Sequence, residues 1–167
     1  MREEVIFREE THKDAATITD IIKRAFEKHP HSDQKEHLIV QRLRDQSALT
    51  LSLVAEVSGT VVGHIAFSPV TINGDSLDWV GLGPVSVDPD YQNIGIGSGL
   101  IKNGLRRIED SKANGCVLLG EPGFYSRFGF TTSIKLTLPD VPADYFMVRP
   151  FGRCVPTGTV SYHSAFS

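Results

Sequence analysis

Hydrophobic positions recur along the chain at two periods, and the change of period separates strands from helices. Short apolar runs bounded by turn residues predict strands over 5–8, 49–57, 60–70, 82–87, 116–120, 132–138, 145–148 and 159–162. Apolar stripes at helical spacing predict one helix over 13–27 and a second that starts at Ser32. We expect Thr11 and Ser32 to cap these helices. The second helix is expected to bury Leu38, Ile39 and Leu43.

Turn residues between the runs indicate how the strands pair. Ser58-Gly59 and Asn73-Gly74 are typical two-residue hairpin turns, so the strands around them are expected to form an antiparallel meander. A helical segment after Gly95 leads to the strand at 116–120, and this connection has the form of a crossover between parallel strands. A short helix is expected from Pro122 to Arg127. The predicted fold class is mixed α/β (α+β): a twisted, mostly antiparallel sheet with one parallel crossover and helices on both faces.

The segment from Leu82 to Arg107 combines a strand, a turn, a glycine loop and a helix. Asp88-Pro89-Asp90 is a turn signal after the apolar strand. Gly95 and Gly97 then begin a helix whose apolar residues recur on one face as far as Ile108. The start of a helix has unpaired N–H groups and a partial positive charge, and glycines let a bulky anion approach them. This pattern is typical of a phosphate-binding loop.

Two nucleotide motifs compete for the same glycines. A Walker loop ends in Gly-Lys-Ser/Thr, but Ser98 follows Gly97, so no lysine stands there to reach a γ-phosphate. The dinucleotide fingerprint G-x-G-x-x-G matches Gly95 and Gly97 but has Leu100 at its third glycine. The insert Pro-Asp-Tyr-Gln-Asn also separates the strand from the glycines, where that fold needs a tight turn. The sequence therefore excludes the Walker loop and leaves a nicotinamide-binding fold as a minor alternative.

A different family matches this loop better. Gln92-Asn93-Ile94-Gly95-Ile96-Gly97 fits the acetyl-CoA signature Gln/Arg-x-x-Gly-x-Gly/Ala of the GCN5-related N-acetyltransferase (GNAT) superfamily, which the chain resembles. A second block, Glu121 to Phe130, is similar to the late Tyr-x-Lys/Arg-x-Gly-Phe motif of that family. The sequences of Leu82–Val87 and of this second block most resemble those of the YhbS-like predicted N-acetyltransferases.

This resemblance implies an enzyme that transfers an acetyl group from acetyl-CoA, its co-substrate, to a primary amine of an unidentified small molecule or peptide by direct attack. The pyrophosphate is expected on the amides of residues 93–98 and the pantetheine arm along strand 82–87. Pro84 in that strand indicates a bulge or a missing ladder bond. The first two helices border the acceptor site in the family. The residues implied to bind the cofactor are Val85, Ser86, Val87, Gln92, Asn93, Ile94, Gly95, Ile96, Gly97, Ser98 and Tyr125.

Tyr125 is also the implied catalytic residue. In the family the tyrosine of this motif lies near the CoA sulfur, and a phenol with an ordinary pKa of about 10 is suited to protonate a thiolate leaving group. The general base stays open among Glu56, His64, Asp88, Glu121 and a water molecule. An alternative function of another class is a non-catalytic sensor module that binds acyl-CoA.

Composition narrows the range of partners. The chain has 167 residues, and we expect a single domain over 1–167. A formal net charge of −3 without a basic block argues against nucleic acid. No apolar run approaches the roughly 20 residues of a membrane helix, and Met-Arg-Glu-Glu does not resemble a secretory signal, so a cytoplasmic location is expected. Neither a disulfide between Cys116 and Cys154 nor a metal site is predicted, and a homodimer stays open.

Overall fold

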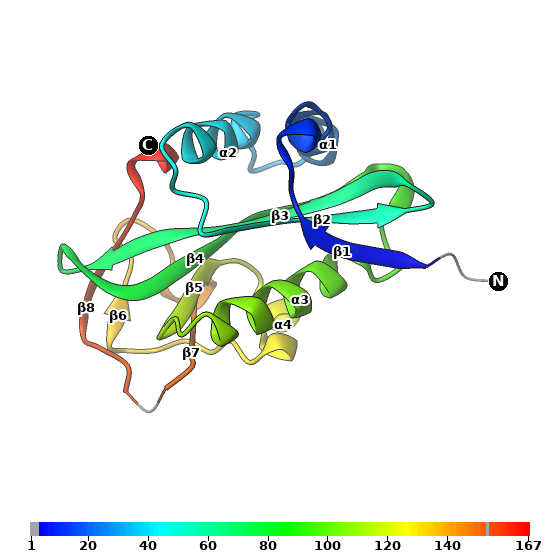
Figure 1. Cartoon of the computed structure of the whole chain (residues 1–167). Helices are drawn as coiled ribbons and strands as arrows, with labels where there is room; N and C mark the ends of the chain where they lie inside the picture. Colours follow the sequence, from blue (N-terminus) through cyan, green and yellow to red (C-terminus); the bar gives the residue numbers. More distant parts are fainter. Residues whose placement is uncertain (1–3, 153) are drawn as a thin grey trace.

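The computed structural model describes residues 4–152 and 154–167, and one twisted sheet runs through its centre (Figure 1). The strand order is β1-β2-β3-β4-β5-β7, while β8 pairs with the end of β3 and with β6. The strands are β1 Val5–Glu9, β2 Leu51–Val57, β3 Thr60–Ile72, β4 Asp75–Val87, β5 Gly115–Leu119, β6 Leu136–Thr137, β7 Phe146–Pro150 and β8 Gly158–Tyr162. Residues 1–3, on which the expectation about a secretory signal partly rests, lie outside the described residues.

Helices cover both faces of the sheet, with α1 and α2 on one side and α3 and α4 on the other (Figure 1). The α-helices are α1 Ala15–Phe26, α2 Glu36–Asp45, α3 Ile96–Asp110 and α4 Pro122–Tyr125. Short 3-10 turns are η1 His12–Asp14, η2 Pro89–Tyr91, η3 Ser126–Phe128, η4 Ala143–Tyr145 and η5 Ser164–Phe166. The β4–β5 pair is parallel, whereas β1 to β4 pair antiparallel. The predicted fold class is therefore confirmed.

Both hairpin turns adopt the backbone that their residues favour. Ser58 and Gly59 have φ values of 49° and 80°, and Asn73 and Gly74 have 53° and 83°. Two consecutive residues in the left-handed region match the right-handed twist of the flanking strands. These turns join β2 to β3 and β3 to β4, which confirms the predicted meander.

The apolar residues form three clusters, one of them where Trp79 and Val117 pack against Val160 of β8, and the other two beneath helices on opposite faces of the sheet. The larger one lies under α3, where Leu100, Ile101 and Leu105 are buried against β2, β3, β4 and β5. The other is formed where Ile18 of α1 packs against Val54 and Ala66. Packing on the two faces of the sheet fixes the positions of α1 and α3 relative to the end of β4, which lies between these helices.

Three predicted elements are clearly wrong in extent. The strand predicted over 82–87 begins earlier, at Asp75. The second helix begins at Glu36 rather than after Ser32, because Gln34 has a φ of 63°, which an α-helix does not contain. Of its predicted buried residues, Leu43 is confirmed, whereas Ile39 is half-buried and Leu38 is 37% exposed; Val40 is buried as well.

The strand predicted over 132–138 shortens to Leu136–Thr137. The hydroxyl of Ser133 accepts the N–H of Lys135 at 3.1 Å, and this local bond replaces a ladder bond.

The first helix begins at Ala15 after η1, and the carboxylate of Asp14 accepts the N–H of Thr11 at 2.7 Å.

Strands β4 and β5 pair over a short length only. The register joins Trp79, Val80 and Gly81 to Gly115, Cys116 and Val117, and no pairing continues beyond Gly81. On the other edge of β4, Ile65 faces Val85 but Phe67 faces Leu82, so β4 carries one extra residue at Gly83-Pro84. The bulge expected from Pro84 is confirmed. From here to Val87, the β5-facing edge of β4 is left without a strand partner.

Candidate active site

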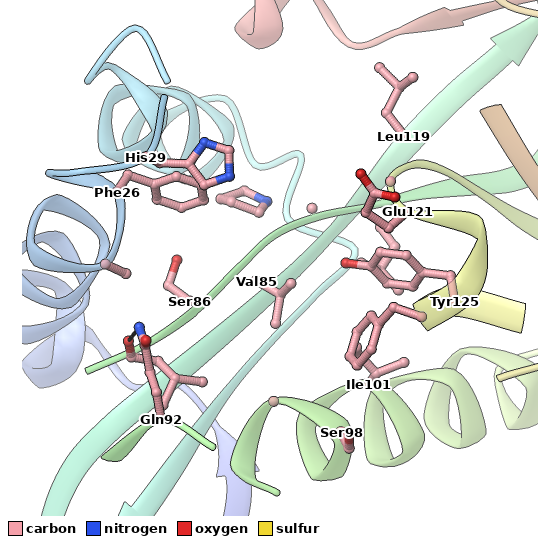
Figure 2. A pocket seen from close by; sticks show the side chains of 18 of the residues that line it. Phe26, His29, Val85, Ser86, Gln92, Ser98, Ile101, Leu119, Glu121 and Tyr125 are labelled. Atoms are coloured by element: carbon pink, nitrogen blue, oxygen red, sulfur yellow. Dashed lines mark hydrogen bonds between the residues drawn. The ribbon is translucent and has the colours of Figure 1, made fainter. Parts of the chain in front are cut away.

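A cavity of about 1110 Å³ opens where β4 and β5 separate (Figure 2). Four parts of the chain line it: the end of β4, the loop that leads into α3, the segment from β5 into α4, and the end of α1 with the loop after it. A further wall comes from the segment around η4. The cavity therefore lies between the two helical layers.

The start of α3 presents free main-chain amides to this cavity. Asn93 and Gly95 have φ values of 66° and 93°, and this left-handed backbone turns the loop into the helix. The first amide in the helical ladder is that of Gly99, which donates to the Gly95 carbonyl at 3.0 Å, so the amides of Ile96, Gly97 and Ser98 have no intrahelical partner. Among the described residues that line the cavity there is no lysine or arginine. An anion here would be held by amides and by the helix dipole.

The end of β4 presents a free strand edge beside these amides. The N–H of Asp88 donates to the Val62 carbonyl at 2.8 Å, so residues 62 and 88 form a hydrogen-bonded pair. Because such pairs alternate along an antiparallel ladder, the main-chain groups of Val85 and Val87 point away from β3 and toward the cavity. Gln92 donates its side-chain amide to the Val87 carbonyl at 3.0 Å and holds the loop against the strand. An extended ligand with amide groups can pair with this edge as a strand does.

Comparison with known proteins identifies the family of this chain. Residues 7–133 match the family model described as an acetyltransferase (GNAT) domain. The chain belongs to the GNAT family of acetyltransferases. The uncharacterized N-acetyltransferase YhbS of Escherichia coli K12 is 34% identical over 170 residues, which cover 98% of this chain and 99% of that protein. The predicted resemblance is thus confirmed, and the chain is a GNAT-family N-acetyltransferase.

Solved structures of GNAT proteins carry the cofactor. A GNAT family acetyltransferase from Brucella melitensis, in complex with acetyl-CoA, superposes with a TM-score of 0.90 at 47% identity over 99% of this chain and 100% of that one. YhbS from Escherichia coli, in complex with CoA, superposes with a TM-score of 0.91 at 34% identity over 99% of this chain and 93% of that one.

In this GNAT chain, Tyr125 is held by packing so that its hydroxyl points into the cavity (Figure 2). Its ring lies over Gly120, where any side chain would collide with it. Edge-to-face contact with Phe124, at 5.0 Å between ring centroids, and with Phe130 at 6.2 Å fixes the ring further. Burial raises the pKa of Tyr125 above its ordinary value, so the phenol stays protonated at neutral pH.

The four candidate bases of the GNAT chain differ in access to the cavity. Glu56 binds Arg8 at 3.3 Å and is absent from the lining. His64 lies on β3 and is fully buried, and burial lowers its pKa to about 4. Asp88 binds Arg24 at 2.7 Å; burial acts to raise its pKa, but the Asp90 amide and Arg24 together hold the pKa below the ordinary value. Among these four, Glu121 alone lines the cavity.

The predicted cofactor residues come together with one exception. All of them line the cavity apart from Ile94, whose side chain is 68% exposed. Ser86 lines it through its side chain, because its main chain faces β3 in the pair with His64. All these roles stay predictions.

Several lining residues had no motif to indicate them. They come from the end of α1 and the loop after it, the end of β5, and η4 with the residues before it: Phe26, His29, His31, Leu119, Val141, Pro142 and Tyr145. Of these places, only the end of α1 was indicated, by the expectation that the first two helices border the acceptor site. In the described part of the chain, no helix is long and apolar enough to cross a membrane, and no group of three or more His, Cys, Asp or Glu residues is arranged to hold a metal ion.

Proposed function

We propose that this chain, as a single domain over residues 1–167, transfers the acetyl group of acetyl-CoA to a primary amine of a small molecule or peptide by direct attack. One observation carries the proposal: free amides at the start of α3, a free strand edge on β4 and the hydroxyl of Tyr125 share a single cavity. GNAT relatives that cover nearly the whole chain bind acetyl-CoA or CoA in their solved structures, which supports the cofactor assignment.

The main chain would hold the cofactor at two places. The pyrophosphate would accept hydrogen bonds from the amides of Ile96, Gly97 and Ser98, with the helix dipole opposing its charge. The amides of the pantetheine arm would pair with Val85 and Val87, on the strand edge that β5 leaves open. One N–H of this edge would also polarise the thioester carbonyl, a contribution worth about 3 kcal/mol in the transition state of acyl transfer.

Tyr125 and Glu121 would move the protons. The neutral amine attacks the thioester carbon, the carbon–sulfur bond breaks, and the thiolate takes the proton of the Tyr125 hydroxyl. The proton lost by the amine passes to Glu121, directly or through a water molecule. A covalent acetyl-cysteine route is disfavoured, because Cys116 is fully buried and burial raises the pKa of its thiol.

The acceptor side of the cavity is largely apolar. Phe26, Leu119 and Tyr145 line it on the face covered by α1, and Leu119 and Tyr145 are 46% and 41% exposed. Exposed apolar side chains at a cavity mouth gain by contact with an apolar ligand. Glu121 supplies a carboxylate near them for an ammonium group. We therefore favour an amine that carries an apolar substituent.

The decisive experiment measures thiol release from acetyl-CoA with a panel that contains 2-phenylethylamine, spermidine and a short peptide with a free N-terminus. Amine-dependent thiol release and an acetylated product confirmed by mass spectrometry would support the proposal. Calorimetry with acetyl-CoA, without amine, is run in parallel. Tight binding without any turnover across a broad panel would favour the sensor function instead.

A further inference from the structure

A series of hydrogen-bonded polar side chains, partly buried at Arg44 and Glu10 and fully buried at His64, runs from the protein surface toward the cavity. Arg44 of α2 donates two hydrogen bonds of 2.9 Å each to the carboxylate of Glu10. The hydroxyl of Ser52 on β2 contacts the same carboxylate. The Ser52 oxygen also lies 2.8 Å from Nε2 of His64 on β3. These residues link three elements across one face of the sheet.

The ionisation states of Glu10 and His64 determine where the hydrogens lie in this series of side chains. Burial acts to raise the pKa of Glu10, but the bonds from Arg44 and Ser52 outweigh it, so the carboxylate is ionised and only accepts. Ser52 must then donate its single hydrogen to Glu10, which leaves its oxygen to accept from His64. His64 is neutral near pH 7, because burial lowers its pKa. Its one hydrogen therefore sits on Nε2, and Nδ1 is a bare acceptor.

The acceptor atom Nδ1 has no hydrogen-bond partner, although His64 is fully buried. Directly opposite on β4 stands Ser86, which is 3% exposed and whose hydroxyl also has no partner. Side chains of such a cross-strand pair share one face of the sheet, with Cβ atoms roughly 5 Å apart. Figure 2 shows the Ser86 hydroxyl on the side of Phe26 and His29, while Val85 points the opposite way. Buried polar atoms without partners are rare in folded proteins, and a pair of them at a cavity wall indicates a ligand.

We propose that Ser86 binds the nucleophilic amine of the acceptor: when the amine binds, the Ser86 hydroxyl turns so that Nδ1 of His64 accepts its hydrogen and its oxygen accepts an N–H from the amine. The inference rests on the proposed acetyl transfer. Ser86 touches the substrate, whereas His64, Ser52, Glu10 and Arg44 are positioning residues that act through it. The hydrogen bond aligns the nitrogen lone pair with the thioester, which Val85 and Val87 hold on the opposite side of the same strand.

The test compares Ser86→Ala with Ser68→Ala. Ser68 lies on β3, on the same face as His64. It is fully buried and also has a hydroxyl without a partner, but it does not line the cavity. With the best amine of the panel, Ser86→Ala is expected to lower kcat/KM for the amine by roughly 10- to 100-fold, as for loss of a hydrogen bond to a polar group. The Kd for acetyl-CoA should change less than about twofold, and Ser86→Thr should restore part of the loss. Ser68→Ala should match the wild type.

The positioning chain has its own readout. Ser52→Ala removes the group that accepts the Nε2 hydrogen, so it should also lower kcat/KM, and Ser52→Ala combined with Ser86→Ala should be no worse than Ser86→Ala alone. Independently of any acceptor, NMR of the ¹⁵N-labelled imidazole should show His64 protonated on Nε2. On addition of the best amine, the Nδ1 signal should shift in the wild type but not in Ser86→Ala.

Each result decides a different claim. Equal kcat/KM for Ser86→Ala and Ser68→Ala, or a His64 hydrogen on Nδ1, overturns the role of Ser86 while leaving acetyl transfer intact. Failure of the wild type to acetylate any amine overturns the proposed function, and the role of Ser86 falls with it. Additive losses in the double variant overturn the positioning chain.

Discussion

The buried imidazole of His64 makes the stability of this protein depend on pH in a way that its surroundings predict. Burial lowers the pKa of His64 from 6.5 to about 4, so the folded state binds a proton less readily than the unfolded chain. The contribution that the neutral His64 makes to the free energy of unfolding is complete above pH 6.5 and is lost as the pH falls toward 4. Between pH 7 and pH 5 the linkage relation gives a loss of about 2 kcal/mol in the free energy of unfolding from this group alone.

Urea unfolding at pH 7 and pH 5 measures this loss when wild type is compared with His64→Gln. The free energy of unfolding should fall by about 2 kcal/mol more in the wild type than in the variant, because other titrating groups contribute equally to both. Ser68→Ala, which removes a buried polar group that does not titrate, should keep the wild-type pH dependence. An identical fall in wild type and His64→Gln would mean that the folded protein admits the proton, and the hydrogen assignment in the buried chain would be wrong.

Three further predictions concern the cofactor site, the acid and the N-terminal ion pair. Gly97→Val should weaken acetyl-CoA binding at least about tenfold by calorimetry with little change in Tm, because a Cβ there meets only Val87, at 3.7 Å, and the added bulk enters the space proposed for the pyrophosphate. Unchanged affinity would place the phosphates elsewhere. Tyr125→Phe should lower kcat by about 10² or more while leaving the Kd for acetyl-CoA unchanged, and equal turnover would remove the acid role. Arg8 holds the pKa of Asp14 at about 2, so the wild type should lose about 2 kcal/mol of stability relative to Asp14→Asn as the pH falls from 4 to 2, and parallel acid unfolding curves would contradict this.

The local pattern of the sequence was sufficient for the antiparallel meander and for the glycine loop before α3. Asn73-Gly74 and Ser58-Gly59 dictate their hairpins because few other residues tolerate a left-handed backbone. Gly95 likewise dictates the turn into α3, whose apolar face follows from a period that the chain itself displays. Such features depend on neighbours in sequence, so they can be read without the fold.

Elements whose stability comes from a competing local bond were misjudged. The segment around Ser32 has the composition of a helix start, yet the left-handed Gln34 delays the helix to Glu36. Likewise, the apolar residues over 132–138 suggested a strand, but Ile134 is fully exposed and Ser133 binds the chain back onto itself. Hydrophobic pattern cannot rank a strand against a turn when their free energies are close.

Only the tertiary structure distinguished the candidate bases by their partners and by their access to the cavity. Sequence offered Glu56, His64, Asp88 and Glu121 as equivalents, since each stands near the end or middle of a strand. In the fold, Glu56 forms an ion pair with Arg8 and Asp88 forms one with Arg24. His64 is completely buried, and Glu121 lines the cavity. Both arginines lie far from their carboxylate partners in the sequence. The ionisation and access of a side chain depend on the groups that surround it in space, and the sequence order does not show these groups.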